Sequence, residues 1–415
     1  MKHSTRFAFI ILAAGTLFSC TEQFLEKGDL TSKISSDAVL SQAVPSASKT
    51  TQISQDAYIV VYKEGTSDKE VENEVGEMEN SEKINTEHVY NKVFKGYAAI
   101  LSPSALAKVK QNSKVAYVEK DQIMSINLTT MPNPVWGLDR IDQVSLPLST
   151  SFSYNSNGTG VDAYIIDTGI FLSHADFGGR AVGGFSSIGA STNWVDQNGH
   201  GTHVSGIVGG STYGVAKNVK LIAVRVLDAT GSGTTSGVIA GINWAINHHT
   251  TNPAVANMSL GGSASSALDL AVSNAVKDGI VMCVAAGNNA ADASRYSPAR
   301  VSTAITVGAT GAYPTLGLNY DVFASYSNYG TLVDVLAPGS SILSDYVTNS
   351  TATTAILSGT SMATPHVAGV VASYLANNKT ALPSQVETYI KSSSTKNKIT
   401  GIRGTTANNL LFTNN

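Results

Sequence analysis

Three polar side chains with complementary chemistry follow one another in a fixed order along the chain. Asp167 ends the apolar run Tyr-Ile-Ile and precedes Thr-Gly, His200 stands between two glycines, and Ser361 stands in the run Ser-Gly-Thr-Ser-Met-Ala-Thr-Pro-His. A serine hydroxyl becomes an effective nucleophile only beside a base, and histidine has the ordinary pKa for that task. A neighbouring carboxylate would fix the histidine tautomer and stabilise the imidazolium. The three residues together predict nucleophilic catalysis.

The elements expected around these residues would bring them to one edge of a sheet. Asp167 is expected at the carboxyl end of a buried strand, where open α/β sheets bind their ligands. Small residues after His200 and around Ser361 predict helices, with Pro365 in the first turn of the second helix, where a missing N–H costs little. Ser361 would then face unpaired N–H groups that stabilise an oxyanion. Taken alone, Ser361 could be a helix-capping serine and His200 a structural histidine. Neither alternative explains why Asp167, His200 and Ser361 occur together in this order.

With these motifs the chain resembles the subtilisin-like serine proteases, and within them the proteinase K and aqualysin branch. The resemblance begins at Trp136, continues through the motifs at 255–262 and 284–289, and ends near Asn409. It therefore covers the whole of the expected catalytic domain. It implies that the three residues above form a Ser-His-Asp triad.

The resemblance also implies an oxyanion hole and leaves one histidine as the base. Asn288 matches the side-chain donor of the family, and the backbone N–H of Ser361 would be the second donor. His203 and His366 are implied to be structural, so that His200 carries the chemistry. A turn asparagine that follows a strand is the alternative for Asn288.

Three segments of small residues match the parts of the family that bind peptides. Two of them would hold a substrate as an added strand, because glycines allow another backbone to approach closely. The third would line the pocket for the side chain before the scissile bond, and its small uncharged residues predict a broad preference for apolar or aromatic side chains. Turns that bind nothing are the alternative for each segment alone. The predicted substrate-binding residues are Gly231, Ser232, Gly233, Ser259, Leu260, Gly261, Ala285, Ala286 and Gly287.

Structural calcium is implied by the resemblance alone. The first site would combine one carboxylate with two backbone carbonyls, and the second, seen in the aqualysin branch, would combine two carboxylates with an amide. In the second site Ser149 stands where some relatives have another carboxylate, and solvated surface carboxylates are the alternative. The residues matched are Asp334, Ser302 and Ala304 in the first site, and Asp139, Asp142 and Gln143 in the second.

Residues 1–20 are typical of an export signal. Two basic residues precede an apolar segment that is too short to span a bilayer, and Leu-Phe-Ser-Cys ends it. This ending resembles a bacterial lipoprotein box and predicts lipidation of Cys20, with an ordinary cleaved signal as the alternative. Residues 21–55 are polar and aperiodic, as expected for a flexible tether.

Residues 56–127 predict a small α+β domain with the ferredoxin-like order β-α-β-β-α-β. This order resembles the inhibitory propeptide of subtilisin-like proteases. An independent binding domain is the alternative, but the position directly before a protease domain favours a propeptide that is removed near residues 127–131. The predicted strands are 57–62, 88–94, 96–101 and 115–119, and the predicted helices are 67–80 and 104–110.

Residues 128–415 predict an α/β domain with a mostly parallel sheet flanked by helices, which is the subtilisin-like fold. Apolar strands that alternate with helices are typical of a parallel sheet covered on both faces. A dinucleotide-binding fold would share this architecture, but Gly158-Thr-Gly160 precedes its strand instead of following it, which excludes that interpretation. The predicted strands are 161–167, 219–227, 254–260, 280–286 and 304–309, and the predicted helices are 202–209, 235–247 and 266–277.

Composition limits the partners of the protein. The net charge is −3 and no basic run occurs, which argues against binding to nucleic acid. Cys20 belongs to the targeting segment and Cys283 to an apolar strand, so the two cysteines are not expected to pair, and Cys283 is expected to be buried. The precursor is expected to attach to a membrane only through a lipid on Cys20.

The sequence thus predicts a secreted, monomeric serine endopeptidase that cleaves proteins through an acyl-enzyme, is inhibited by its own propeptide and binds structural Ca²⁺. The alternative is a catalytically silent relative that only binds peptides. Loss of Asp167, His200, Ser361 or Asn288 would favour that alternative, and all four are present.

Overall fold

The structure is a computed structural model that describes residues 54, 56–125, 129–130, 136–312 and 320–413. The predicted export signal with Cys20, and residues 21–53 of the predicted tether, lie outside these residues. Within the described part of the chain, no helix combines the length and the apolar character needed to cross a bilayer.

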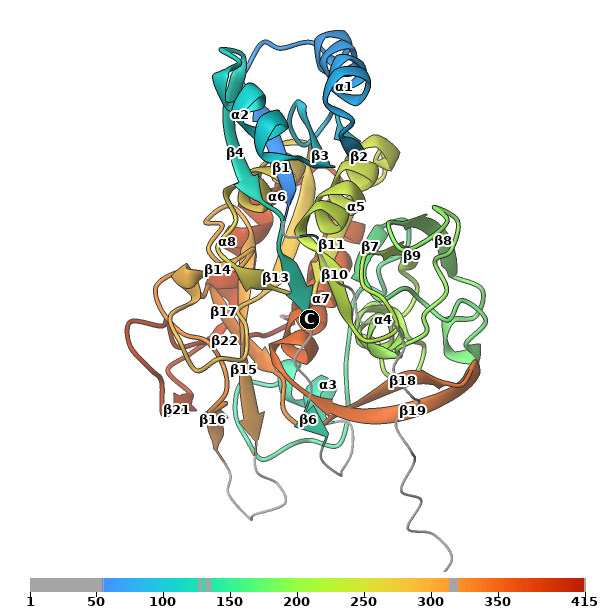
Figure 1. Ribbon diagram of the computed structural model, residues 1–415. Coiled ribbons are helices and arrows are strands. Elements are labelled where there is room, and N and C mark those ends of the chain that lie inside the picture. Colours follow the sequence, from blue (N-terminus) through green and yellow to red (C-terminus); the bar gives the residue numbers. More distant parts are fainter. Residues whose placement is uncertain (1–53, 55, 126–128, 131–135, 313–319, 414–415) are drawn as a thin grey trace, which may run out of the picture. The chain divides into compact units, whose positions relative to one another are not determined.

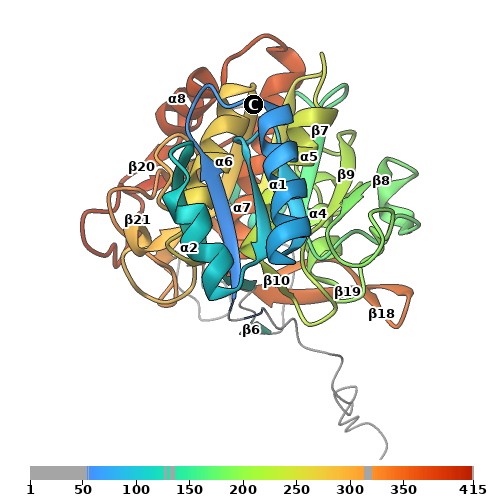
Figure 2. The same ribbon diagram turned by 45° about the horizontal axis from the view of Figure 1, so that its top comes forward.

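The first domain has the predicted order β-α-β-β-α-β. Its sheet has the strand order β2-β3-β1-β4 with antiparallel neighbours, and both helices lie over one face of it (Figures 1 and 2). The elements are β1 (Ala57–Tyr62), α1 (Asp68–Glu82), β2 (Asn85–Tyr90), β3 (Gly96–Ile100), α2 (Pro103–Gln111) and β4 (Val115–Lys120).

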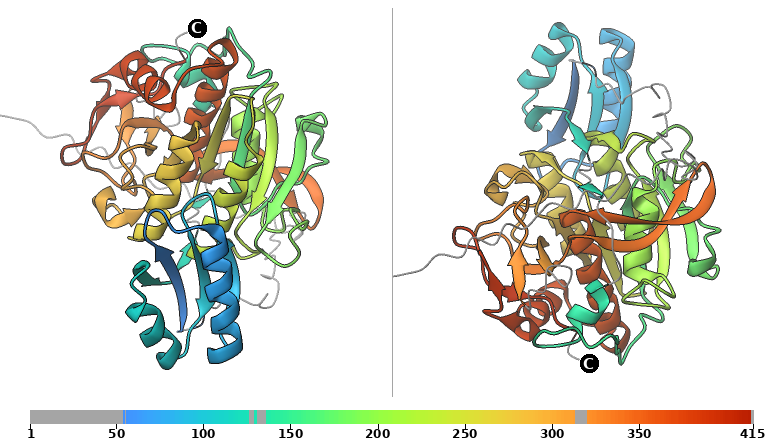
Figure 3. Two further views of the ribbon diagram at one scale, coloured as in Figure 1. Left: turned by 90° about the horizontal axis from the view of Figure 1, so that it is seen from above. Right: turned by 90° about the horizontal axis from the view of Figure 1, so that it is seen from below.

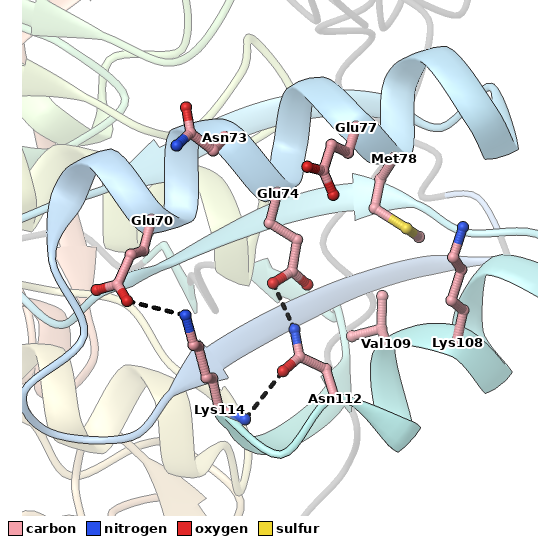
Figure 4. A pocket seen from close by; sticks show the side chains of 9 residues that line it. All are labelled: Glu70, Asn73, Glu74, Glu77, Met78, Lys108, Val109, Asn112 and Lys114. Carbon is pink, nitrogen blue, oxygen red and sulfur yellow. Dashed lines mark hydrogen bonds and ion pairs between the residues drawn. The ribbon is translucent and has the colours of Figure 1, made fainter.

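Polar contacts join the two helices of this domain across a groove on its surface (Figure 4). Glu70 of α1 pairs with Lys114 at 2.8 Å, and Glu74 of α1 accepts a hydrogen bond from Asn112. Ser67 and Glu70 form a capping box at the start of α1. These contacts orient α1 relative to the end of α2.

The second domain is built on one sheet of 11 strands, most of which run parallel. The order along its main path is β20-β22-β17-β15-β13-β11-β7-β9-β8, and β16 and β21 attach beside β15. This confirms the predicted mostly parallel sheet flanked by helices. Its strands are β7 (Asp162–Asp167), β8 (Ala181–Ser186), β9 (Lys220–Arg225), β11 (Ala254–Met258), β13 (Ile280–Ala285), β15 (Ile305–Ala312), β16 (Asp321–Phe323), β17 (Val335–Pro338), β20 (Thr395–Lys396), β21 (Ile399–Thr400) and β22 (Asn409–Leu410).

Shorter strands and the helices surround this sheet. The remaining strands are β5 (Ile123–Ser125), β6 (Thr129–Thr130), β10 (Ser232–Thr234), β12 (Gly262–Ser263), β14 (Tyr296–Ser297), β18 (Ile342–Thr348) and β19 (Thr351–Ser358). The helices are α3 (Trp136–Ile141), α4 (His200–Gly209), α5 (Thr235–His248), α6 (Ser266–Lys277), α7 (Thr360–Asn377) and α8 (Pro383–Ser393), with short 3₁₀ turns at Ala175–Phe177 and Ala293–Arg295.

Side chains of each central strand alternate between two apolar layers. In β7, Ala163 and Ile165 belong to the cluster that contains α4, α7 and α8, whereas Tyr164 and Ile166 belong to the cluster that contains α5 and α6. All six residues of β7 are buried, as expected for a parallel strand covered on both faces. The second cluster also includes Ile59 of β1, so the sheet of the first domain packs against α5 and α6.

The strand predicted at 88–94 lies earlier in the structure, at Asn85–Tyr90, and the residues that follow it bind a side chain of the second domain instead. β2 stops at Tyr90, and the N–H groups of Asn91, Lys92 and Val93 lie 3.4, 2.9 and 3.4 Å from Oδ1 of Asn243 in α5. These backbone donors are therefore satisfied across the domain contact instead of by a neighbouring strand.

The hairpin β18–β19 lies across α4 (Figure 3), and β18 carries a buried carboxyl group at this contact. The side chain of Asp345 in β18 is fully buried; its Oδ1 lies 3.5 Å from His174 Nδ1, and neither of its oxygens accepts a hydrogen bond from a described residue. One oxygen each of Asp345 and Asp176 would lie 2.9 and 2.4 Å from a Cβ atom placed on Gly210, so the two carboxyls are close neighbours. Although burial opposes it, hydrogen bonds from Thr212 lower the pKa of Asp176. Burial, together with the charge of Asp176, raises the pKa of Asp345 to about 8, so Asp345 holds a proton that it can donate to Asp176.

We expect Asp345→Asn to stabilise the protein at alkaline pH. The pKa of Asp345 in the folded state is raised from 3.8, so the wild-type protein loses stability as the pH rises from that value, and the loss is complete when a second anion has formed beside Asp176 above about 8. The amide of asparagine stays neutral and can donate to Asp176 at any pH. Thermal unfolding of the Ser361→Ala precursor should give a higher midpoint for the Asp345→Asn variant well above this pH, and a much smaller difference well below it. An equal difference on both sides of it would contradict the assignment.

Candidate active site

Asp167 and His200 form a buried hydrogen bond at the carboxyl end of the sheet. The Asp167 Oδ1 atom lies 2.7 Å from His200 Nδ1, and both side chains are fully buried. Asp167 is the last residue of β7, as predicted, and His200 is the first residue of α4, two residues earlier than the predicted start of that helix. Because Nδ1 donates to the carboxylate, Nε2 of a neutral His200 is the acceptor, and it has no hydrogen-bond partner among the described residues.

A second buried aspartate ties β7 to the start of α4. Asp196 Oδ1 accepts hydrogen bonds from Thr168 Oγ1 and Gly199 N, and its Oδ2 accepts one from Thr202 N, over distances of 2.8–2.9 Å. Gly199 needs its positive φ of 106°, and a Cβ there would lie 2.3 Å from the ring of Tyr346. The helix start is thereby fixed against the strand that carries Asp167.

Ser361 lies in the first turn of α7, as predicted, but its hydroxyl points to a backbone carbonyl in this structure. Its Oγ donates to Ser259 O at 3.2 Å. The side chain is 3% exposed, and α7 packs against α4, which carries His200. The Ser361–His200 hydrogen bond is not made in the described conformation.

Pro365 corrects one prediction. Because α7 begins at Thr360, Pro365 lies beyond the first turn, inside the helix. Any other residue there would donate its N–H to the carbonyl of Ser361, four residues earlier. Ser259 Oγ supplies that hydrogen bond instead, at 2.8 Å, so the interior proline leaves no carbonyl of α7 unsatisfied at Ser361.

Asn288 is oriented by the residue that precedes Ser361. Its Oδ1 accepts from Thr360 N at 2.9 Å and from Thr360 Oγ1 at 2.8 Å, and Thr360 Oγ1 in turn accepts from Gly287 N at 3.2 Å. The amide nitrogen of Asn288 is thus turned away from Thr360. Sequence reasoning named Asn288 and Gly287 but missed Thr360, for which the only signal is its position next to Ser361.

The other two histidines near the site are used by backbone carbonyls. His203 Nε2 lies 3.1 Å from both Ile342 O and Ala355 O, and burial lowers its pKa to about 3. His366 Nδ1 lies 2.8 Å from Met362 O, and burial lowers its pKa to about 4. Both imidazoles are therefore neutral and committed to the fold, in keeping with the structural role implied for them.

The predicted substrate segments hold a strand of the chain itself. β5 pairs antiparallel with β10, in a register that sets Ser125 opposite Ser232 and Met124 opposite Gly233. On its other side β5 contacts β12, where a Cβ on Gly262 would lie 2.4 Å from Met124 Sδ. Gly231 makes the turn before β10, Leu260 and Gly261 lead into β12, and Ala285, Ala286 and Gly287 follow one another at the end of β13.

The chain also pairs with the strand that precedes Ser361 in the sequence. Thr129 and Thr130 of β6 pair antiparallel with Ser358 and Leu357 of β19, which ends three residues before Ser361. β5 ends at Ser125, and residues 126–128 between the two seated strands lie outside the described residues. The polypeptide is thus paired with β10 up to Ser125 and with β19 from Thr129 onward.

Two carboxylates of the first domain cap helices of the second. Asp121 accepts from Ser236 N at 2.9 Å at the start of α5, and Glu119 accepts from Ala267 N at 3.2 Å at the start of α6. Negative charges at helix N-termini are stabilised by the helix dipole. Sequence reasoning missed both contacts, since the partners lie more than 100 residues apart and no local pattern connects them.

The second predicted calcium site contains an unsatisfied oxygen. Asp142 Oδ1 is buried and has no hydrogen-bond partner among the described residues, which is the kind of atom that a bound cation satisfies. Asp139 Oδ1 and Gln143 Oε1 both accept from Ser149 N at 2.9 Å, so all three predicted ligands surround one loop. No group of three or more histidine, cysteine, aspartate or glutamate side chains in the described ranges could hold a metal ion, so other oxygens would have to complete this site.

The first predicted calcium site does not fit an ion in the same way. Ser302 and Ala304 precede β15, whose Thr306 N donates to Asp334 Oδ2 at 2.9 Å. The other oxygen of Asp334 is paired with Lys391.

Comparison with known proteins identifies a family and close relatives. The subtilase family model matches residues 158–409, and the peptidase inhibitor I9 model matches residues 57–127. Alkaline serine exoprotease A of Vibrio alginolyticus is 47% identical over 370 residues, which are 86% of this chain and 67% of that protein. The extracellular serine proteinase of Thermus sp. strain Rt41A is 50% identical over 325 residues, 78% of this chain and 77% of that protein. The crystal structure of a cold-adapted subtilisin-like serine proteinase is similar with a TM-score of 0.63 at 49% identity, covering 68% of this chain and 99% of that one.

The hydrogen bond between Ser259 and the carbonyl of Ser361 gives a test by double substitution. Ser259→Ala should lower the free energy of unfolding by about 1 kcal/mol, because the carbonyl of Ser361 loses its donor. Pro365→Ala restores an N–H to the helix and should recover much of that loss when it is added to Ser259→Ala. Denaturant unfolding of the four forms, each carrying Ser361→Ala to prevent self-digestion, measures the coupling. Strictly additive effects would show that Ser259 does not stand in for the missing N–H.

Proposed function

The chain belongs to the subtilase family of serine peptidases, and we propose that it is an endopeptidase with Ser361 as nucleophile, His200 as base and Asp167 as orienting acid. The family membership predicted from the sequence is confirmed by the match over residues 158–409, and an inhibitor-type propeptide precedes the peptidase domain. The observation that carries the residue assignment is the buried Asp167–His200 hydrogen bond, which leaves Nε2 as the proton acceptor.

In the proposed reaction the Ser361 hydroxyl rotates from Ser259 O towards His200. Its oxygen attacks the carbonyl carbon of the scissile bond while its proton passes to His200 Nε2. The tetrahedral oxyanion is stabilised by the Ser361 N–H at the start of α7 and by the Asn288 amide that Thr360 orients. The C–N bond then breaks, His200 returns the proton to the leaving amine, and water hydrolyses the acyl-enzyme by the same steps in reverse order.

We also propose that β5 marks the path of substrates. Peptides would add to β10 as an antiparallel strand, with the side chain at the position of Met124 buried against the apolar cluster around α5 and α6. Ala285, Ala286 and Gly287 would line the pocket before the scissile bond. Small uncharged walls support a broad apolar-to-aromatic preference.

The same geometry supports self-processing of the precursor. The chain pairs with β10 up to Ser125 and with β19 from Thr129, which supports a cut between these two residues. This range overlaps the region 127–131 predicted from the sequence, and the proposed domains are 56–127 and 128–415. After the cut, the first domain would remain as an inhibitor held by β5 and by the caps on α5 and α6.

Further proposals concern location and calcium. We propose that the enzyme acts outside the cell as a monomer, with support from a relative whose name is extracellular serine proteinase. Lipidation of Cys20 would anchor only the precursor, because Cys20 precedes the cut. Calcium would be held by Asp142 together with Asp139 and Gln143, supported by the buried Asp142 Oδ1 that lacks a donor. The next experiment tests the assignment of the nucleophile.

Ser361→Ala should abolish peptidase activity, with a loss of about 10⁶-fold in kcat, the size known for the corresponding change in subtilisin. It should also leave the precursor uncut and, if Cys20 is lipidated, in the membrane fraction, whereas mature wild-type enzyme should be free. The measurements are casein hydrolysis, intact mass and cell fractionation.

Ser373→Ala is the matched control, because Ser373 lies in the same helix and its hydroxyl has no partner among the described residues. It should mature and cleave casein normally. A Ser361→Ala protein that matured and cleaved casein at near wild-type rates would overturn the assignment, and a precursor of it found free in the medium would overturn the anchor alone.

A further inference from the structure

A lysine lies at the carboxylate that the family resemblance assigns to calcium. Lys391 Nζ lies 3.3 Å from Asp334 Oδ1 and 2.6 Å from Glu387 Oε1. Glu387 and Lys391 are one turn apart in α8, so the helix itself presents both charges to Asp334. The side chains of Asp334 and Glu387 are 15% and 21% exposed, which means that the ammonium group meets both carboxylates in a partly desolvated place.

The remaining contacts of Asp334 complete its coordination without an ion. Its Oδ2 accepts from Thr306 N at 2.9 Å, and its backbone carbonyl accepts from Asn409 Nδ2 at 3.0 Å. Both carboxylate oxygens are therefore engaged, one by a backbone donor and one by a cation. Lys391 thus links α8 to Asp334, the residue directly before β17. It occupies the position where the first predicted calcium site would place an ion.

Calcium and this ammonium group compete for the same position. Ca²⁺ takes six to eight oxygen ligands, and an ammonium group has no lone pair to offer. The ammonium group would also repel a divalent cation bound to the same carboxylate, because two positive charges this close together interact strongly where water is partly excluded. Asp142 differs from Asp334 in this respect, because its Oδ1 is buried and has no hydrogen-bond donor among the described residues.

We propose that Lys391 replaces calcium at Asp334, so that this part of the fold is stabilised by an internal ion pair and does not respond to chelators. Calcium dependence of the protein then belongs to the site at Asp142. Removal of the lysine charge should convert the Asp334 position into an additional calcium site, because Asp334 and Glu387 would be left as two uncompensated carboxylates near the backbone carbonyls that precede β15.

The test counts calcium ions on the Ser361→Ala precursor by isothermal titration, and compares thermal midpoints in excess calcium and in EGTA. Asp334→Asn should bind as many ions as the parent protein, whereas Asp142→Asn should bind one fewer and lose the response to EGTA. Lys391→Ala should bind one more ion than the parent, and Asp334→Asn added to it should remove that ion. Lys391→Met keeps the aliphatic stem and should behave as Lys391→Ala if the latter folds poorly.

Lys398→Ala, at an exposed lysine of the same region, is the control and should change nothing. A loss of one ion in Asp334→Asn with Lys391 in place would overturn the proposal. So would the absence of any added ion in both Lys391 variants. These outcomes are independent of the proposed peptidase activity, which none of the measurements uses.

Discussion

The hydrogen bond between Asp167 and His200 sets the strictest requirement on this structure. Both side chains are fully buried, and their atoms meet at 2.7 Å. A buried carboxylate beside an imidazole is tolerated only in accurate geometry, so β7 and α4 must be held rigidly together. Asp196 does this locally, and the two apolar layers of the parallel sheet do it globally. The helix α7 then brings Ser361 to the same end of the sheet, packed against α4.

In the precursor, the segments predicted to bind substrates pack against the first domain and its last strand. β5 fills the space between β10 and β12, and the first domain covers α5 and α6 with the apolar face of its sheet. Asp121 and Glu119 add a carboxylate to the N-terminus of each of these helices. A segment bound in this way stabilises the peptidase domain, and it would also block substrates if they bind to β10 as proposed, because both effects would come from the same hydrogen bonds and the same buried area.

Local patterns predicted most of the fold and the identity of the candidate site residues. β7 and α6 have clear signals, since a continuous apolar run and a repeated apolar face occur at 161–167 and 266–277. β8 contains adjacent glycines, and the hairpin β18–β19 mixes polar and apolar residues, so neither has a pattern distinct from a loop. Pro365 was placed wrongly because its compensation comes from Ser259, about 100 residues earlier. Pairs such as Lys391 with Asp334 are likewise set by tertiary contacts alone.

The roles of Ser361 and His200 are tested most directly by chemical labelling of the mature enzyme with phenylmethylsulfonyl fluoride, followed by peptide mapping. The serine that His200 activates should be the one that forms the sulfonyl ester, because a serine without a base reacts poorly. We expect a single modified peptide, with the label on Ser361, and no label in the protein that carries His200→Ala. A label on any other serine, or equal labelling of Ser361 in the His200→Ala protein, would contradict the roles assigned to Ser361 and His200.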